Sequence, residues 1–185
     1  MSTTDGPVLT AEEFQLLPPV DLWVELVRGK VVATSLPTPR HGLFCGNAAF
    51  LLTDMAHEHS SGRVATHVGI ITGRNPDTVR AADICFYSYE RVPEGRLPDG
   101  YLAVAPDLVI DVRSNEESWT SILERVADYL SAGVLVVAVL DPVTKTLPVF
   151  RPQTSPSVLS VEDELSLAEF FPAAICVPVS RFFAE

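Results

Sequence analysis

Three acidic residues stand alone in or beside apolar stretches that we interpret as β-strands. They are Glu25, Asp83 and Asp111, and a predicted helix carrying Arg125 follows the last of them. A carboxylate beside a buried strand is costly unless something pairs with it, and a divalent cation is a common functional partner. One such acid more often caps a strand or faces solvent, but three in this arrangement indicate a site that binds a cation.

The elements that would position these acids alternate between strands and helices. Hydrophobic periodicity and turn residues predict a short helix after the capping box Thr10–Glu13, a hairpin over 22–33, a helix over 41–59, strands over 64–71, 84–87 and 108–112, a helix over 116–132 and a strand over 134–140. The last strand, helix and strand are typical of a crossover between buried parallel neighbours.

The C-terminal part of the chain is expected to add smaller elements. The pattern predicts an antiparallel edge strand over 146–150, a short strand over 158–161, a helix over 166–170 and an apolar tail containing Phe182 and Phe183. An exposed sheet edge and an apolar tail both favour self-association, so we expect a homodimer.

Composition is that of a soluble globular protein. The chain has 185 residues, of which 47% are apolar and 20% charged, which suits a single domain over 1–185 with a flexible start over residues 1–8. No run reaches the roughly 18 apolar residues that a membrane span requires. The N-terminus has no signal-peptide pattern, so we expect a cytoplasmic protein with no membrane partner.

Charge and cysteine content restrict the binding partners. The net charge of −11 excludes a broad basic surface for nucleic acid, so contact with DNA would need a local patch. Five arginines between positions 63 and 96 either form such a patch or are scattered: Arg63, Arg74, Arg80, Arg91 and Arg96. Cys45, Cys85 and Cys176 are too far apart, without a CxxC pair, to predict a zinc site or a disulfide framework.

A series of short motifs in fixed order then identifies a family. The motifs are Thr10-x-x-Glu13-Phe14, Glu25-Leu26-x-x-Gly29-x-Val31-Val32, Pro37-Thr38-Pro39-x-His41, Asp83, Ala105-Pro106-Asp107-Leu108-Val109, Ser114, Tyr129-x-x-Ala132-Gly133-Val134 and Asp141-Pro142. Over residues 9–183 the chain resembles the Uma-type restriction endonuclease family of the PD-(D/E)XK nuclease superfamily. The resemblance implies an α/β (α+β) fold in which helices flank a mixed central β-sheet.

The resemblance also implies a function and its residues. It implies a metal-dependent DNA endonuclease that hydrolyses phosphodiester bonds, with Mg²⁺ or Mn²⁺ held by Asp83, Asp111 and Glu25. Arg125 takes the position of the motif lysine, four residues before Tyr129, and completes the catalytic set. His41 matches a family position to which we assign no role.

Departures from the family pattern leave alternatives open. Arginine stabilises a phosphate but stays protonated, so Arg125 cannot accept a proton from water. The two lysines of the chain are Lys30 and Lys145, and Lys30 on the Glu25 hairpin could substitute; Ser121 stands where family members often carry an acid. One alternative is therefore a catalytically degenerate, dimeric binding or regulatory module. Another is a hydrolase of a phosphorylated small molecule.

Overall fold

The structure is a computed structural model that describes residues 8–18, 23–171 and 175–185. Its helices are α1 (Ala11–Gln15), α2 (Pro39–His59), α3 (Trp119–Ser131) and the 3₁₀ helix η1 (Val179–Arg181). Its strands are β1 (Trp23–Val27), β2 (Lys30–Thr34), β3 (Gly62–Gly73), β4 (Thr78–Ser88), β5 (Leu108–Val112), β6 (Val136–Leu140), β7 (Thr146–Phe150), β8 (Ser157–Ser160), β9 (Glu164–Ser166) and β10 (Cys176–Pro178). Most of the predicted flexible start and the first predicted hairpin residue lie outside the described residues.

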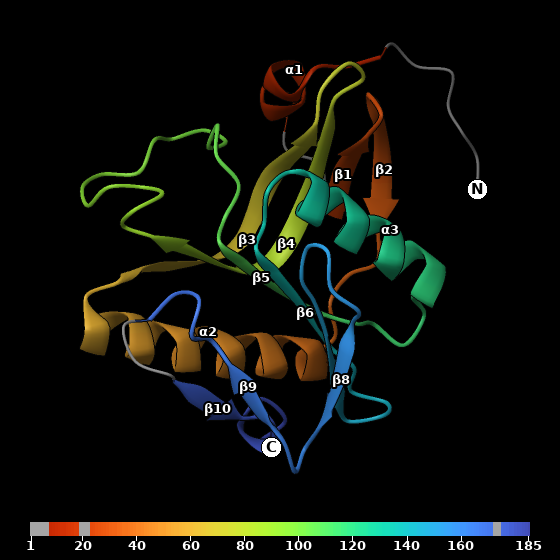
Figure 1. Cartoon of the computed structure of the whole chain (residues 1–185). Coiled ribbons are helices and arrows are strands. Elements are labelled where there is room, and N and C mark those ends of the chain that lie inside the picture. Colours follow the sequence, from red (N-terminus) through yellow and green to blue (C-terminus); the bar gives the residue numbers. More distant parts are fainter. Residues whose placement is uncertain (1–7, 19–22, 172–174) are drawn as a thin grey trace.

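An eight-stranded mixed sheet forms the centre of the molecule (Figure 1). The strand order is β2-β1-β4-β5-β6-β7-β8, and β3 pairs with the other edge of β4. Only β5 and β6 run parallel among the described pairs, with α3 as the connection between them. This is the predicted crossover, and the mixed sheet with flanking helices confirms the predicted fold class.

The two long helices cover opposite faces of the sheet. Along β6, Val136, Ala138 and Leu140 pack in the core that α2 closes, whereas Val137 and Val139 pack against α3. Because both faces of β6 are buried, all of its residues are apolar, and polar residues do not alternate with apolar ones. No helix in the described part of the chain is long and apolar enough to cross a membrane.

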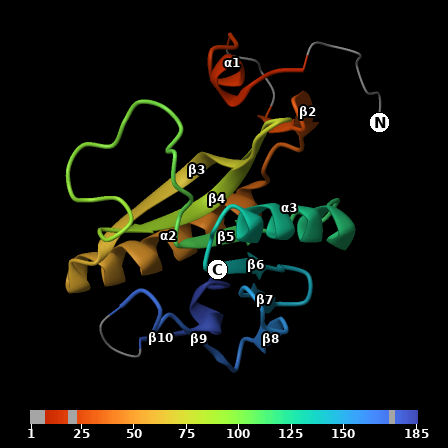
Figure 2. The same ribbon diagram turned by 45° about the horizontal axis from the view of Figure 1, so that its top comes forward.

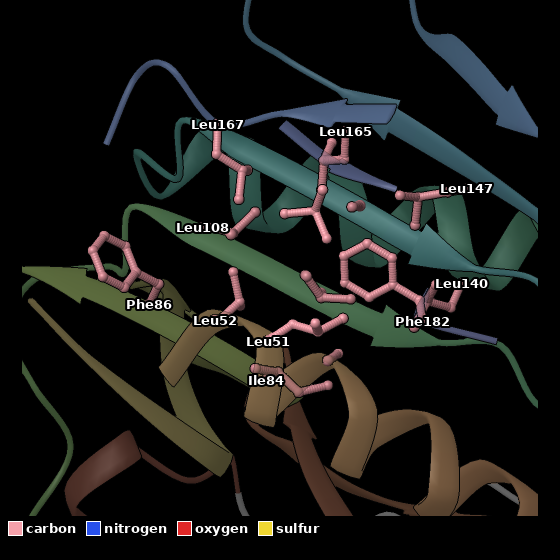
Figure 3. Close-up of a cluster of buried hydrophobic side chains, with 14 of the residues drawn as sticks. Leu51, Leu52, Ile84, Phe86, Leu108, Leu140, Leu147, Leu165, Leu167 and Phe182 are labelled. Carbon is pink, nitrogen blue, oxygen red and sulfur yellow. The ribbon is translucent and has the colours of Figure 1, made fainter. Parts of the chain in front are cut away.

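The core beneath α2 joins segments that are distant in the sequence. Leu51 and Leu52 of α2 meet strand residues of β4 and β5, and Phe182 from the C-terminal segment fills the same cluster (Figure 3). The strands β8, β9 and β10 lie at the end of the molecule opposite α1 and the β1–β2 hairpin (Figure 2). The C-terminal segment therefore closes the core, and the N-terminal hairpin remains outside it.

A division of the sheet at β4 is the feature that creates the site. The same edge of β4 pairs first with β1, at Val79–Leu26, and then with β5, from Ile84–Ile110 onward. Between these two points, residues 80–83 have no neighbouring strand on that edge. The polar backbone groups there must find other partners.

The structure corrects three expectations about the C-terminal part. Residues 166–170 do not form a helix, because Ser166 ends β9 and pairs with Cys176 of β10. The strand over 146–150 is not an edge, because β7 pairs with β6 on one side and β8 on the other. Phe182 and Phe183 are buried. The two features from which we expected a homodimer are therefore internal.

Substitutions at two leucines of α2 should have very different effects on stability, because only one of the two lies in the core. Leu52 is fully buried and Leu43 is 43% exposed. We expect Leu52→Ala to lower the free energy of unfolding by about 2–5 kcal/mol, since it removes buried methyl groups and leaves a cavity. Leu43→Ala should change it by about 0.5 kcal/mol or less. Urea unfolding followed by circular dichroism measures both, and equal effects would contradict this assignment of the core.

Candidate active site

A groove of about 1310 Å³ opens where the sheet divides. The β1–β2 hairpin, the middle of β4, the end of β5 and the first turns of α3 line it. Among the described residues, its charged lining consists of six carboxylates and two guanidinium groups, namely Glu25, Asp83, Asp111, Glu116, Glu117, Glu124, Arg80 and Arg125. An anionic substrate would therefore need added positive charge in order to enter.

Two of the predicted acids satisfy the open edge of β4. The backbone N–H of Ala81 donates to Glu25 Oε1 at 2.9 Å, and that of Asp83 donates to Asp111 Oδ1 at 3.1 Å. In return, the N–H of Val112 donates to Asp83 Oδ2 at 2.8 Å. The β4–β5 register, extended one step beyond Ile84–Ile110, brings Asp83 opposite Asp111. At the end of the β4–β5 ladder, the carboxylate oxygens thus take the place of the backbone carbonyl groups of a neighbouring strand.

Asp111 is the most perturbed acid of the groove. It is 4% exposed, and burial raises the pKa of its carboxyl group to about 7, with Arg125 opposing this effect and the charge of Asp83 adding to it. A buried carboxyl group with a raised pKa gains strongly when a cation approaches. Asp111 is therefore a strong candidate for cation binding.

Arg125 lies beside this acid. Its Nε is 3.5 Å from Asp111 Oδ2, an ion-pair distance but too long for a hydrogen bond, and its Nη1 forms a close ion pair with Glu117. Within the described residues, Nε and the nearby hydroxyl group of Tyr129 are buried without a hydrogen-bond partner. The helix α3 positions Arg125 because its apolar face, with Val126 and Tyr129, packs on the sheet.

Glu25 has a different set of contacts from the other two predicted ligands. Its Oε2 accepts a hydrogen bond from Arg80 Nη1 at 2.8 Å, in addition to the Ala81 bond at Oε1. Arg80 Nε also donates to Asp128 of α3 at 2.8 Å. Since both Glu25 oxygens are engaged, this acid holds Arg80 in place and joins the hairpin to α3.

The three predicted acids do not come together as one three-ligand group. The only such group within residues 8–18, 23–171 and 175–185 is His41, Cys45 and Asp83, with ligand atoms within 4.8 Å of one another. His41, which we had left without a role, lies at the start of α2 with Nε2 3.3 Å from Asp83 Oδ2. Of the predicted acids, Asp83 and Asp111 are joined by a hydrogen bond from the backbone N–H of Asp83 to Asp111 Oδ1, whereas Glu25 pairs with Arg80.

The donors at Asp83 and Asp111 fit a hard divalent cation. Mg²⁺ is commonly held by one or two carboxylates, with waters and substrate oxygens completing its shell. Asp111 is buried, and Arg125 Nε lies at ion-pair distance from its Oδ2 without a hydrogen bond. The pair therefore offers carboxylate oxygens, the ligand type that such a cation prefers.

Other residues singled out from the sequence lie elsewhere or are already paired. Four of the five arginines between positions 63 and 96 bond to carboxylates and Arg63 bonds to backbone carbonyl groups, so they form no basic patch. Lys30 and Lys145 are outside the groove lining, whereas Ser121 lines it. Neither lysine replaces the motif lysine in this arrangement.

Sequence reasoning missed the specific roles of three groove or near-groove residues. Arg80 was considered as part of a basic patch or as a scattered surface charge, but it is 8% exposed and forms ion pairs with two acids. Glu117 pairs with Arg125, which no pattern indicated. Cys45 follows His41 by four residues, so the two share a helix face; that spacing was the available signal.

The raised pKa of Asp111 predicts a pH-dependent stability. Between about pH 4 and pH 7, folded Asp111 keeps a proton that the unfolded chain releases, so stability falls as pH rises through this window. Asp111→Asn removes this contribution. We expect the free energy of unfolding of the wild type, relative to the variant, to fall by up to about 1.4 kcal/mol per pH unit.

Urea unfolding in EDTA at several pH values makes this measurement. Burial alone would lower the pKa of His41, but its hydrogen bond to Asp83 raises it, so His41 adds a further loss of stability above pH 6.5. The exposed Asp99→Asn is the matched control and should follow the wild type. Parallel curves for the wild type and Asp111→Asn would refute the prediction.

Comparison with known proteins identifies the family and the fold of the chain. Residues 11–180 match the model of the Uma2 family, described as "Putative restriction endonuclease". The structure is similar to that of a "putative nuclease belonging to DUF820" from Anabaena variabilis ATCC 29413, with a TM-score of 0.79 and 22% identity over 95% of this chain and 97% of the other. No curated protein matches the sequence. The family match spans nearly the whole chain, and the protein belongs to the Uma2 family of restriction endonuclease-like proteins.

Proposed function

We propose that this protein is a metal-dependent DNA endonuclease that hydrolyses phosphodiester bonds in the groove beside β4. The observation that carries the proposal is the contact between Asp83 and Asp111 at the end of the β4–β5 ladder, with Asp111 buried. Family membership supports a nuclease in general terms. DNA as substrate and dependence on a metal are the proposal's own additions.

Asp83 and Asp111 are the proposed ligands of Mg²⁺ or Mn²⁺. A bound divalent cation supplies positive charge that stabilises phosphoryl oxygens in the transition state and lowers the pKa of a water. The chain contributes the fixed positions of the two carboxylates, each held by a backbone N–H from the neighbouring strand.

Arg125 is proposed to bind the phosphate that is being cleaved. Its buried Nε has no hydrogen-bond partner among the described residues, so it can donate to a substrate oxygen without breaking an existing bond. Arginine remains protonated, so this residue stabilises negative charge and does not take a proton from water. In the hydrolysis itself, water oxygen bonds to phosphorus, the bond to the leaving oxygen breaks, and that oxygen gains a proton.

Glu25 was predicted as a metal ligand and catalytic residue, and its contacts favour a positioning role. Its carboxylate holds Arg80 at 2.8 Å and caps the N–H of Ala81. Arg80 then fixes Asp128 on the helix that carries Arg125. Loss of Glu25 would therefore release both Arg80 and the hairpin, and would act on cleavage through Arg125.

A second candidate is a catalytically degenerate binding or regulatory module. Arg125 forms ion pairs with Glu117 and with Asp111, so it already compensates the charge of one of the two proposed ligands. The groove also has more carboxylates than cationic groups. The same contacts are thus compatible with an enzyme that has no substrate bound and with a site that no longer binds a metal.

We also propose that the protein works as a cytoplasmic homodimer with one domain over residues 1–185. Support for self-association comes from β2, which ends the sheet on the hairpin side. Val31 and Val32 are 40% and 42% exposed on this edge strand. Unpaired strand edges with apolar side chains are surfaces that readily pair with a second chain.

Cleavage assays on supercoiled and linear DNA with Mg²⁺ or Mn²⁺ test the proposal. We expect EDTA and Asp83→Ala to abolish cleavage. Arg125→Ala should lower its rate by about 100- to 1000-fold, the usual effect of removing one donor to a developing negative charge. Arg125→Lys should retain activity because it keeps a cation at this position. The exposed Arg96→Ala is the control and should cleave like the wild type.

Manganese titration by calorimetry separates the two candidate functions. Binding by the wild type that is lost in Asp83→Ala, together with cleavage, supports the endonuclease. If a folded wild type neither binds Mn²⁺ nor cleaves DNA, while Arg125→Lys binds it, the degenerate module is the better description. Cleavage that survives in Asp83→Ala would refute the proposed site.

A further inference from the structure

Three side chains of different chemistry meet at the start of α2. Cys45 Sγ lies 3.4 Å from His41 Nδ1, and His41 Nε2 lies 3.3 Å from Asp83 Oδ2. One ligand atom from each residue can be chosen so that all three lie within 4.8 Å of one another. We infer that His41, Cys45 and Asp83 form a binding site for a thiophilic divalent transition ion of the Zn²⁺ class.

The fold brings these residues together for local reasons. Thr38 caps α2 and accepts a hydrogen bond from the N–H of His41, so His41 lies in the first turn. Cys45 follows four residues later and therefore shares the same helix face. The helix packs on β4 and β5, which turns this face toward Asp83.

The distances are close to those of a tetrahedral site. Zn²⁺ lies about 2.3 Å from a thiolate sulfur and about 2.0–2.2 Å from nitrogen or oxygen, which places the ligand atoms about 3.3–3.6 Å apart. The two measured contacts fall in this range, although they involve different nitrogens of the same ring. Since one ring nitrogen must serve for both contacts and the three ligand atoms lie within 4.8 Å of one another, the widest pair has to close by at most about 1.5 Å.

The fourth position would face the groove. His41 and Asp83 both line it, with side chains 14% and 20% exposed, whereas Cys45 is buried. Three protein ligands with one open position are typical of zinc sites that bind water or substrate. The ion would thus be anchored from the core side and accessible from the groove side.

The ligand types select the ion. Sulfur and imidazole ligands favour Zn²⁺, Co²⁺ and related ions, whereas Mg²⁺ prefers oxygen. Burial and the charges of Asp83 and Asp111 raise the pKa of the Cys45 thiol far above its usual range, so a thiolate forms here only if a cation compensates it. Binding should therefore release a proton.

The inference goes beyond the proposed endonuclease and does not need it, because binding can occur whether or not DNA is cleaved. The two sites share Asp83 but differ in Cys45, which has no part in the proposed cleavage. A cysteine variant therefore tests one site without removing a proposed catalytic residue.

Cobalt titration of the metal-free protein, followed by absorption, is the test. Thiolate coordination to Co²⁺ gives a near-ultraviolet charge-transfer band, and tetrahedral geometry gives intense visible bands. We expect both in the wild type, their displacement by Zn²⁺ and their persistence in excess Mg²⁺. Cys45→Ser should lose the charge-transfer band and bind Zn²⁺ at least about tenfold more weakly. Cys176→Ser, which changes an exposed cysteine, is the matched control and should retain the band.

Three outcomes would overturn the inference: no charge-transfer band in the wild type, a band that survives Cys45→Ser, or a band lost in Cys176→Ser. If Cys45→Ser does not fold, His41→Ala replaces it and should lose the tetrahedral visible bands. Loss of Mg²⁺-dependent cleavage with the cobalt bands retained would count against the endonuclease alone. Retained cleavage without cobalt bands would count against this site alone.

Discussion

The unpaired edge of β4 between β1 and β5 is the constraint on which the site depends. Backbone N–H groups that leave a sheet ladder need acceptors, and here the carboxylates of Glu25 and Asp111 supply them to Ala81 and Asp83. These acids therefore have a structural role, whatever further role they have in the proposed function. Hydrogen bonds from the backbone of β4 fix their positions. They lie close together because the two donor N–H groups, those of Ala81 and Asp83, are only two positions apart.

Charge compensation then links the elements around this edge. Buried carboxylates are tolerated only when paired, and Arg80 and Arg125 supply the positive charge from β4 and α3. Arg80 donates hydrogen bonds to both Glu25 and Asp128, whereas Arg125 Nε has no hydrogen-bond partner among the described residues. The first arginine accordingly stabilises the arrangement, and the second is the one that we propose for phosphate binding. This difference follows from hydrogen-bond partners and could not be seen from residue types.

Local patterns predicted most of the fold. The capping box of Thr10 and Glu13, the helix over α2 and the bounds of β5 and β7 all agree with the structure. The errors arose where distant pairing decided the outcome. Residues 166–170 lack a helix because Ser166 pairs with Cys176, and β7 is internal because β8 covers it. Periodicity within a segment contains no information about such partners.

For the site, the sequence by itself determined which chemistry was available: isolated acids at strand ends, and an arginine in place of the motif lysine. Only the tertiary structure decided how these residues are grouped. It joined Asp83 to Asp111 through hydrogen bonds from the backbone, and it paired Glu25 with Arg80. It also brought His41 and Cys45 close to Asp83, which lies about forty positions further along the chain. The physical reason is that residue types fix charge and ligand preference locally. Distances between them depend on strand register and helix packing, which are long-range properties of the folded chain.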